Sequence, residues 1–359
     1  MKKYKVGIIG ATGMVGQQFV SLMNNHPWFE LTVVAASSRS AGKTYGEAVQ
    51  GRWFMTSEVP KSVANLTVLS AESDIDLIAS SVDFVFSAVD MKKDEIKALE
   101  EAYAKAECPV ISNNSAHRWT PDVPMIIPEV NPEHINVIEA QRKRLGTKRG
   151  FIAVKSNCSI QSYVPALHPI KEKFGLTRAL ACTYQAISGA GKTFESWSEM
   201  IDNVIPYIGG EDEKSEQEPK KVWGTIKDGV IVPDDSIEIT AQCIRVPVSD
   251  GHMAAMFAKF DKKPEIDEIL SLWNNFKGRP QELKLPSAPK QFLHYFEDPT
   301  RPQTKLDRML ENGMAVSLGR LRPDSQFDYK FIGLSHNTLR GAAGGAVLLA
   351  ELLCAEKYI

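Results

Sequence analysis

One short stretch constrains the fold of this chain more than any other. The segment "KVGIIGATGMVG", residues 5–16, is an apolar run that ends in a glycine-rich turn and leads into residues with apolar side chains at helical spacing. A strand, a glycine turn and a helix in that order open a parallel α/β unit, whose turn can hold a phosphate at the helix N-terminus. We therefore expect a nucleotide-binding domain at the start of the chain.

The rest of the chain divides into two patterns. Up to residue 150, strand-like runs at 31–37, 83–89 and 108–114 alternate with helical segments such as 92–107, which predicts a doubly wound parallel sheet. Beyond it, strand-like runs at 179–188, 237–248, 252–260 and 313–321 have fewer helices between them, which favours an α+β domain with a largely antiparallel sheet. We predict domains at 1–155 and 156–336, with the C-terminal segment 337–359 completing the first domain as a helix.

Composition excludes several classes of function. The 359 residues carry a net charge of −2, so no overall field favours nucleic acid or an anionic membrane. No apolar run approaches the roughly 18 residues that a membrane span needs, and the opening "MKKYKVGIIG" lacks the pattern of a signal peptide. The five cysteines form no CxxC pair. We expect a cytoplasmic protein without a disulfide framework or a metal site.

The glycine-rich turn and the end of the second predicted strand indicate the cofactor. Gly10, Gly13 and Gly16 have GxxGxxG spacing, which is a weak signal because such glycines can also serve helix–strand packing. An NAD site usually places an acid after the second strand, but "AASSRSAGKTYG" (35–46) has none. Its donors suit a 2′-phosphate and therefore favour NADP, although a serine-rich surface turn is the alternative: they are Ser37, Ser38, Arg39, Ser40 and Lys43.

Cys158, in "SNCSIQS", is the candidate nucleophile. It precedes apolar residues at i, i+3, i+4 and i+7 spacing, which predicts a helix that starts near the thiol. A thiol at a helix N-terminus has a lowered pKa, and the free N–H groups around Asn157 and Cys158 could stabilise an oxyanion. Pro165 could kink or shorten this helix. The alternative is an ordinary buried thiol.

Two residues of "IRVPVSDGHMAAMF" are candidate partners of the thiol. His252 follows an Asp-Gly turn between two predicted strands and is the best of seven histidines to take a proton from the cysteine, though it could simply bond to backbone in the turn. Arg245 ends a strand-like run, where a buried guanidinium needs an anionic partner. A substrate carboxylate would provide one, and a structural ion pair is the competing explanation.

Together these residues resemble one family. The motifs "GATGMVG", "SNNSAHRW", "SNCS", "QAISGAG", "IGGEDEKSEQEPKK", "RVPVSDGH", "RPQTKLDR" and "SHNTLRGAAGG", spread over essentially the whole chain, are similar to those of the aspartate-β-semialdehyde dehydrogenases of archaea, fungi and some bacteria. The resemblance implies an NADP-binding domain and a catalytic and dimerisation domain. It also implies NADPH-dependent reductive dephosphorylation of L-aspartyl-4-phosphate in lysine, threonine and methionine biosynthesis. The family habit is a homodimer or homotetramer.

The resemblance also implies roles for single residues. Cys158 corresponds to the acyl-accepting nucleophile and His252 to the acid/base. The implied substrate-binding residues are Gln185, Arg245 for the amino-acid carboxylate, Arg118 and Lys214 for phosphate, Glu211 and Asn157. The implied cofactor-binding residues are Gly10, Thr12, Gly13, Met14, Val15, Ser37, Ser38, Arg39, Ser40, Ser87, Ser188, Gly189 and Asn337.

Three other functions remain open from the sequence. Malonyl-CoA reductase resembles this family and retains a comparable Cys, His and Arg, and N-acetylglutamyl-phosphate reductase is a more distant relative. A nucleotide-binding regulatory protein without catalysis is the third. The presence of Cys158, Gln185, Arg245 and His252 together argues against that last alternative.

Overall fold

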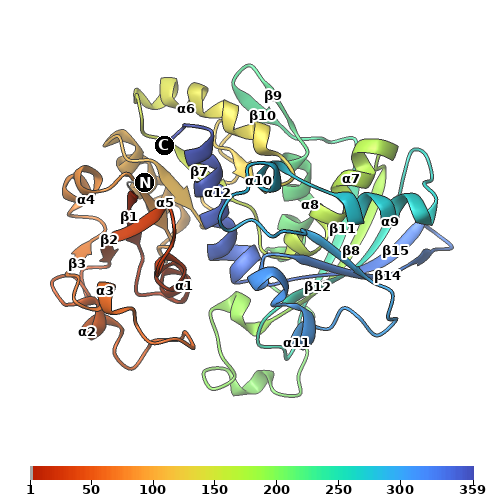
Figure 1. The fold of residues 1–359 in the computed structure, drawn as a ribbon, viewed down its shortest axis with the longest axis horizontal. Coiled ribbons are helices and arrows are strands. Elements are labelled where there is room, and N and C mark those ends of the chain that lie inside the picture. The colour runs from red at the N-terminus through yellow and green to blue at the C-terminus, as the bar shows by residue number, and fades with distance from the viewer. Residues whose placement is uncertain (1–2) are drawn as a thin grey trace.

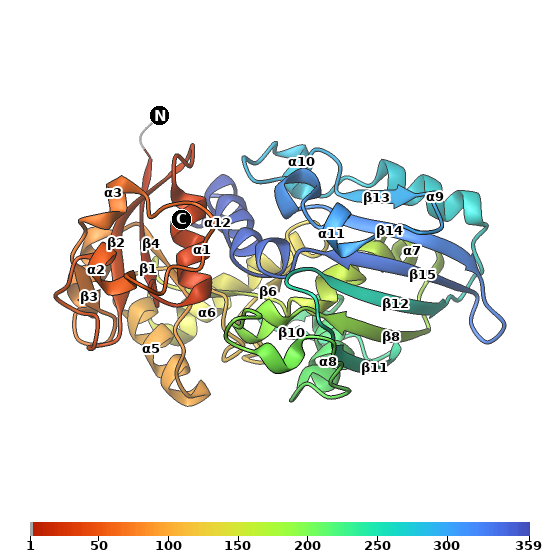
Figure 2. The same ribbon diagram turned by 90° about the horizontal axis from the view of Figure 1, so that it is seen from below.

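The computed structural model describes residues 3–359, which form two sheets joined by the C-terminal helix (Figures 1 and 2). The first sheet has seven strands, and all of its pairings are parallel. In spatial order the strands are β3 (Val68–Ser70), β2 (Phe29–Ala36), β1 (Tyr4–Ile9), β4 (Phe84–Ser87), β5 (Val110–Ser112), β7 (Ile152–Lys155) and β6 (Met125–Ile126). The predicted doubly wound architecture is confirmed.

Helices flank this sheet, and the burial of its strands explains their apolar sequences. The residues Val6, Ile8 and Ile9 of β1 are completely buried, as expected for a parallel strand covered on both faces. The helical segments are α1 (Met14–Met23), α2 (Tyr45–Val49), α3 (Lys61–Ala64), α4 (Ile75–Ser81), α5 (Lys93–Lys105), the 3₁₀ turn η1 (Pro132–Val137) and α6 (Ile138–Leu145).

The second sheet has six strands and mixed pairing. Its strands in spatial order are β11 (Glu238–Arg245), β8 (Arg178–Gln185), β12 (His252–Lys259), β15 (Tyr329–Ser335), β14 (Val316–Pro323) and β13 (Leu293–Phe296). The three central pairings are antiparallel, and the two at the edges are parallel. The expectation of a largely antiparallel sheet is thus confirmed in the centre. A separate hairpin pairs β9 (Thr225–Lys227) with β10 (Val230–Val232).

Helices cover only one face of the second sheet. Helices α7 (Val164–Phe174) and α9 (Ile266–Asn275) share a buried cluster with Ala179, Ala181 and Met256. Residues that alternate with these along the strands, such as Leu180 and Tyr184, remain partly or fully exposed. The remaining helical segments of this half are η3 (Ile187–Ala190), η4 (Ser198–Met200), α8 (Glu211–Val222), α10 (Arg279–Glu282), α11 (Thr304–Asp307) and η5 (Leu310–Gly313).

The C-terminal helix α12 (Gly344–Ala355) lies between the two sheets and packs against the first (Figure 1). Its Ala346, Leu349 and Leu353 share a buried cluster with residues of β1 and β4. A π-helical turn, η6 (Leu339–Ala343), precedes it. The assignment of 337–359 to the first domain and the boundary at 155/156 both stay predictions.

The expected helix at Cys158 is different in the structure. Ser159–Ser162 form a single 3₁₀ turn, η2, and the chain leaves helical geometry at Tyr163 before α7 begins at Val164. The break has a physical reason: Pro165 occupies the first turn of α7, where its missing N–H costs nothing, but it would disrupt a helix that continued through it. Cys158 therefore precedes one tight turn and not a long helix.

No helix within residues 3–359 is long and apolar enough to cross a membrane.

Candidate active site

Three of the predicted site residues meet where the strands β8 and β11 end and β12 begins. We call this end of the second sheet the catalytic edge. Gln185 and Arg245 end the parallel neighbours β8 and β11 and stand opposite each other in register. Strand β12 runs antiparallel to β8, so its first residue, His252, lies at the same edge. All three side chains are buried. The topology therefore brings together residues that are up to 67 positions apart in the chain.

A hydrogen-bond network centred on Glu211 connects four predicted substrate residues. The carboxylate of Glu211, at the start of α8, accepts from the Asn157 side chain at 3.0 and 3.1 Å, from Gln185 at 3.2 Å and from Lys214 Nζ at 2.7 Å. Burial raises the pKa of Glu211, but the Lys214 charge and these hydrogen bonds outweigh it, so the pKa is lowered overall. Glu211 is thus a fixed anion that orients Gln185 and Asn157.

Cys158 is half-buried, and its thiol does not have the lowered pKa that the sequence suggested. Burial raises the pKa, and the charge of Glu211 raises it further, whereas Lys155, Arg118 and Arg245 oppose both. The missing long helix removes the dipole that the expectation relied on. The resting group is therefore a thiol, which needs its surroundings to stabilise the thiolate.

The predicted oxyanion donors are only partly free. The backbone N–H of Asn157 donates to Glu218 Oε2 at 2.6 Å, and its side-chain amide donates to Glu211. Within residues 3–359, the backbone N–H of Cys158 has no acceptor. This leaves the Cys158 N–H, and not the Asn157 N–H, as the available backbone donor.

His252 is completely buried and neutral. Burial and the Arg245 charge lower its pKa to about 3. The N–H of Ala186 donates to Nδ1 at 3.0 Å, which makes Nδ1 an acceptor and places the proton of the neutral ring on Nε2. Within the described residues, Nε2 has no hydrogen-bond partner. His252 therefore presents an unused N–H to the site.

Arg245 and His252 face the same space, which only glycine leaves open. A Cβ atom added to Gly189 would lie 3.0 Å from Arg245 Nη1 and 3.0 Å from His252 Nε2. Arg245 donates to the carbonyl of Ala186 at 2.6 Å and has no carboxylate partner among residues 3–359. The structural ion pair considered as an alternative is thus absent there, and the guanidinium can take an external carboxylate.

Arg118 and Lys214, the predicted phosphate residues, are both ion-paired. Arg118 Nη1 lies 2.8 Å from Glu218 Oε1, and Arg118 Nε donates to the carbonyl of Lys155 at 3.1 Å. Lys214 is paired with Glu211 and is partly exposed. Their assignment to phosphate stays a prediction.

The glycine-rich turn fits a bound dinucleotide. Gly10 has a φ of +85°, and a Cβ there would lie 2.4 Å from the carbonyl oxygen of Ala88. Gly13, the N-cap of α1, is exposed, with no side-chain cap on the helix and no close neighbour for an added Cβ. The first N–H groups of α1 are thus open to a pyrophosphate, next to Thr12, Met14 and Val15.

The loop after β2 presents the predicted 2′-phosphate residues unequally. Ser37, Ser38 and Arg39 are exposed, whereas Ser40 is buried and accepts from Arg52 at 3.2 Å. Ser87, at the end of β4, is also buried and accepts from Asn114 at 3.0 Å. Ser40 and Ser87 are therefore engaged within the protein, whereas Ser37, Ser38 and Arg39 are open to solvent, and cofactor contacts of all five stay a prediction.

A cavity of about 550 Å³ lies between the glycine-rich turn and Gly189, which borders Arg245 and His252. Met14 and Val15 of α1 line it from the first domain, and Ser188 and Gly189 line it from the second. Asn337 fixes this side by donating to Ser188 Oγ at 2.8 Å and accepting from the N–H of Gly251 at 2.7 Å. Both polar groups of Asn337 are thus engaged, which is the geometry of a support for the cofactor cleft.

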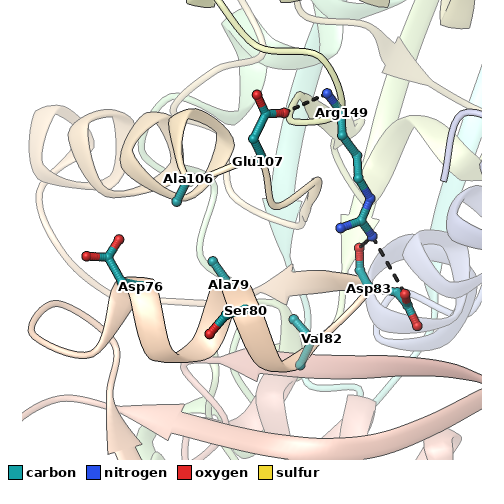
Figure 3. A pocket seen from close by; sticks show the side chains of 8 residues that line it. All are labelled: Asp76, Ala79, Ser80, Val82, Asp83, Ala106, Glu107 and Arg149. Atoms are coloured by element: carbon teal, nitrogen blue, oxygen red, sulfur yellow. Dashed lines mark hydrogen bonds and ion pairs between the residues drawn. The ribbon is translucent and has the colours of Figure 1, made fainter.

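A second cavity, of about 500 Å³, lies away from these residues, between α4 and the end of α5 (Figure 3). Glu107 accepts from the backbone N–H of Arg149 at 2.6 Å, and the Arg149 guanidinium lies 3.8 Å from Asp83. None of the predicted site residues lines this cavity. Among residues 3–359, no group of His, Cys, Asp or Glu side chains is arranged to hold a metal ion.

Sequence reasoning missed three residues near Cys158. Glu218 bonds to both Arg118 and Asn157, Lys155 lies buried at the end of β7, and Gly341 leaves room for the nucleophile. A Cβ on Gly341 would lie 2.9 Å from Cys158 Cβ. A signal for Lys155 was present in the sequence: in "FIAVKSNCS" a charged residue ends an apolar strand directly before the cysteine motif.

Comparison with known proteins agrees with this geometry. The semialdehyde dehydrogenase NAD binding domain matches residues 5–138, and the semialdehyde dehydrogenase dimerisation domain matches residues 167–340. The aspartate-semialdehyde dehydrogenases of Methanothermobacter thermautotrophicus and Saccharomyces cerevisiae are 43% and 42% identical to this chain. These matches cover 97% and 98% of the chain and 98% of each relative.

A solved structure gives the same result. The aspartate semialdehyde dehydrogenase of Candida albicans, crystallised with NADP, superimposes with a TM-score of 0.89 at 38% identity, over all of both chains. The resemblance predicted from the sequence motifs is confirmed. On its sequence, its fold and its two matched domains, the chain belongs to the aspartate-semialdehyde dehydrogenase family.

Proposed function

We propose that this protein reduces L-aspartyl-4-phosphate to L-aspartate 4-semialdehyde with NADPH, through a thioester on Cys158. The observation that carries the proposal is the meeting of Gln185, Arg245 and His252 at one sheet edge beside a cavity that reaches the glycine-rich turn. The Candida albicans relative was crystallised with NADP, and a Vibrio cholerae relative (TM-score 0.75, 25% identity) was solved in complex with ASA. The product feeds lysine, threonine and methionine biosynthesis.

Substrate binding follows from the charges of the site. Arg245, which lacks a carboxylate partner among the described residues, takes the α-carboxylate through its planar guanidinium. Gln185, fixed by Glu211, orients the acyl group, while Arg118 and Lys214 hold the phosphate at the other end. The exposed loop with Arg39 contacts the cofactor 2′-phosphate.

The chemical steps need an anionic sulfur and hydrogen-bond donors. The Cys158 thiolate attacks the acyl phosphate, the C–O bond to phosphate breaks, and the thioester forms. NADPH, when bound, supplies the hydride that reduces this thioester. Reduction leaves a tetrahedral oxyanion on the Cys158 sulfur, which collapses to the aldehyde as the C–S bond breaks and the thiolate is released. Cys158 rests as a thiol, and it gives its proton to solvent before the attack, because the proton of neutral His252 already occupies Nε2. His252 then assists by donating from Nε2 to the sulfur and to the oxygen as each becomes negative.

We also propose a homodimer and a cytoplasmic location. The match to a dimerisation domain indicates an oligomer, and the uncovered face of the second sheet, with Leu180, Tyr184 and Phe257, is an apolar surface that a second copy could cover. A dimer of dimers is the larger form that the family habit allows.

One assay tests the activity and its closest alternatives. Reduction of NADP is measured with aspartate semialdehyde in the presence of either inorganic phosphate or coenzyme A. We expect phosphate-dependent reduction of NADP and none with coenzyme A. Coenzyme A dependence would place the protein with acyl-CoA reductases such as malonyl-CoA reductase, and the absence of any turnover would favour the regulatory protein.

A further inference from the structure

A buried lysine beside Cys158 has no partner for its charge. Lys155 ends β7, three residues before the cysteine, and is 2% exposed. Among residues 3–359 its ammonium has one acceptor, the adjacent carbonyl of Ser156, and no carboxylate within ion-pair distance. An ammonium carries three donors and is costly to bury without compensation. The site must therefore contain a reason to retain this charge.

Two glycines at the junction of η6 and α12 lie against the lysine and the cysteine. A Cβ added to Gly345, in α12, would lie 3.6 Å from Lys155 Cε, and one added to Gly341, in η6, would lie 2.9 Å from Cys158 Cβ. The backbone between them leaves helical geometry at Ala342. The Lys155 and Cys158 side chains therefore pack against the same short segment, residues 341–345.

The other charges nearby are already paired. Three ion pairs surround the two residues: Arg118–Glu218 at 2.8 Å, Lys214–Glu211 at 2.7 Å and Arg340–Glu129. Arg245 is assigned to the substrate carboxylate. Lys155 is the remaining cation in this part of the described chain, and among residues 3–359 the neighbouring group that lacks a partner and can become an anion is the thiol of Cys158.

We propose that Lys155, in its protonated form, is the cation that stabilises the thiolate of Cys158, a positioning residue that acts through the sulfur. This deepens the proposed function and rests on the role of Cys158 in it. Burial, together with Arg118 and Arg340, lowers the pKa of Lys155 to about 7, while Cys158 and Glu218 oppose that shift. Burial and Glu211 raise the pKa of Cys158, while Lys155, Arg118 and Arg245 lower it. Each of the two groups therefore favours the charged form of the other.

Lys221 provides a matched control in the same chain. It is equally buried, at 2% exposed, and burial lowers its pKa to about 8. Its ammonium donates to three backbone carbonyls, those of Arg118, Thr120 and Val123, at 2.6–3.1 Å. Lys221 is thus a satisfied structural lysine, in contrast to Lys155.

The test follows the pH dependence of Cys158 alkylation by iodoacetamide. The protein is used without cofactor in a phosphate-free buffer, and the modified Cys158 peptide is quantified by mass spectrometry. In Lys155→Met and Lys155→Gln we expect the pH at which alkylation reaches half its maximal rate to rise by about one unit or more. At pH 7 the alkylation of Cys158 then slows about tenfold. Lys155→Arg, which keeps the charge, and the control Lys221→Met should stay close to the unmodified protein.

Two results would overturn the proposal. One is a Lys155→Met or Lys155→Gln protein that folds and binds NADPH but keeps the pH midpoint of Cys158 alkylation. A change in phosphate affinity alone, with that midpoint unchanged, counts as the same result. The other is an equal shift in Lys155→Arg, which would make the role one of packing. Turnover that survives complete alkylation of Cys158 would instead show that Cys158 is not the nucleophile. The pH midpoints of alkylation would still decide whether Lys155 stabilises its thiolate.

Discussion

The cofactor turn and the catalytic edge are built in opposite ways. The turn at residues 10–16 is one continuous segment that offers backbone N–H groups. Its glycines have no side chains and so leave space for a ligand. The catalytic edge collects buried side chains from β8, β11, β12, α8 and the segment before η2. Binding of the cofactor is thus a local property, whereas the chemistry depends on groups that fix one another's charge and position.

The largest test of this comparison is Cys158→Ala. We expect turnover to be abolished, because no thioester can form, while NADPH binding stays nearly intact, because the turn is a separate structure. Steady-state kinetics and a fluorescence titration with NADPH measure the two properties. The control is Cys108→Ala, a buried thiol in the first domain, which should keep full activity at a stability cost of roughly 1 kcal/mol. Activity above a few per cent in Cys158→Ala would exclude the thioester.

The same difference explains what the sequence could predict. The strand–turn–helix unit and the strands of the second sheet could be predicted because the spacing of apolar residues and the residue types of turns are local properties of the sequence. Arg118, Lys214 and Glu211 were found only by resemblance. The Lys214–Glu211 pair spans one helix turn, whereas Arg118 pairs with Glu218 across 100 positions, and that contact was missed. The lowered thiol pKa was wrong because Pro165 shortens the helix and burial dominates, which no local pattern reveals.

His252 predicts how the catalytic edge responds to acid. Its pKa falls from 6.5 to about 3 on folding, so below pH 6.5 the unfolded chain binds a proton that the folded ring excludes. The neutral His252 therefore leaves the free energy of unfolding undiminished above pH 6.5. As the pH falls toward 3 this free energy decreases, by on the order of 3 kcal/mol between pH 7.5 and 4.5.

The measurement is urea unfolding at pH 7.5 and pH 4.5. In His252→Asn the loss of unfolding free energy between these values should be smaller by about that amount. The control His294→Asn, a partly exposed histidine in β13, should keep the original dependence. Equal acid sensitivity of His252→Asn and the unmodified protein would contradict a buried neutral imidazole.

Arg245→Lys separates charge from geometry within the catalytic edge. An ammonium keeps the charge but not the planar pair of donors, so we expect a loss of ~1–3 kcal/mol in transition-state binding, which lowers kcat/KM for the semialdehyde about 5- to 150-fold. The KM for NADP should change little. Arg178→Lys, an exposed arginine paired with Glu238 on the same sheet, is the matched control and should leave both constants unchanged. A fully active Arg245→Lys would show that the carboxylate binds elsewhere.

The smallest expected effect belongs to the cofactor side. Arg39 is an exposed residue after β2, and solvent screens its attraction to a 2′-phosphate, so Arg39→Ala should cost about 1 kcal/mol. That is a rise of roughly fivefold in the KM for NADPH, with little change for NADH, because NADH lacks the phosphate. Lys97→Ala, on α5 outside the loop, controls for loss of a positive charge. An equal rise for both cofactors would mean that Arg39 shapes the loop and does not contact the phosphate, and the turn at 10–16 would then bind either cofactor without regard to its ribose.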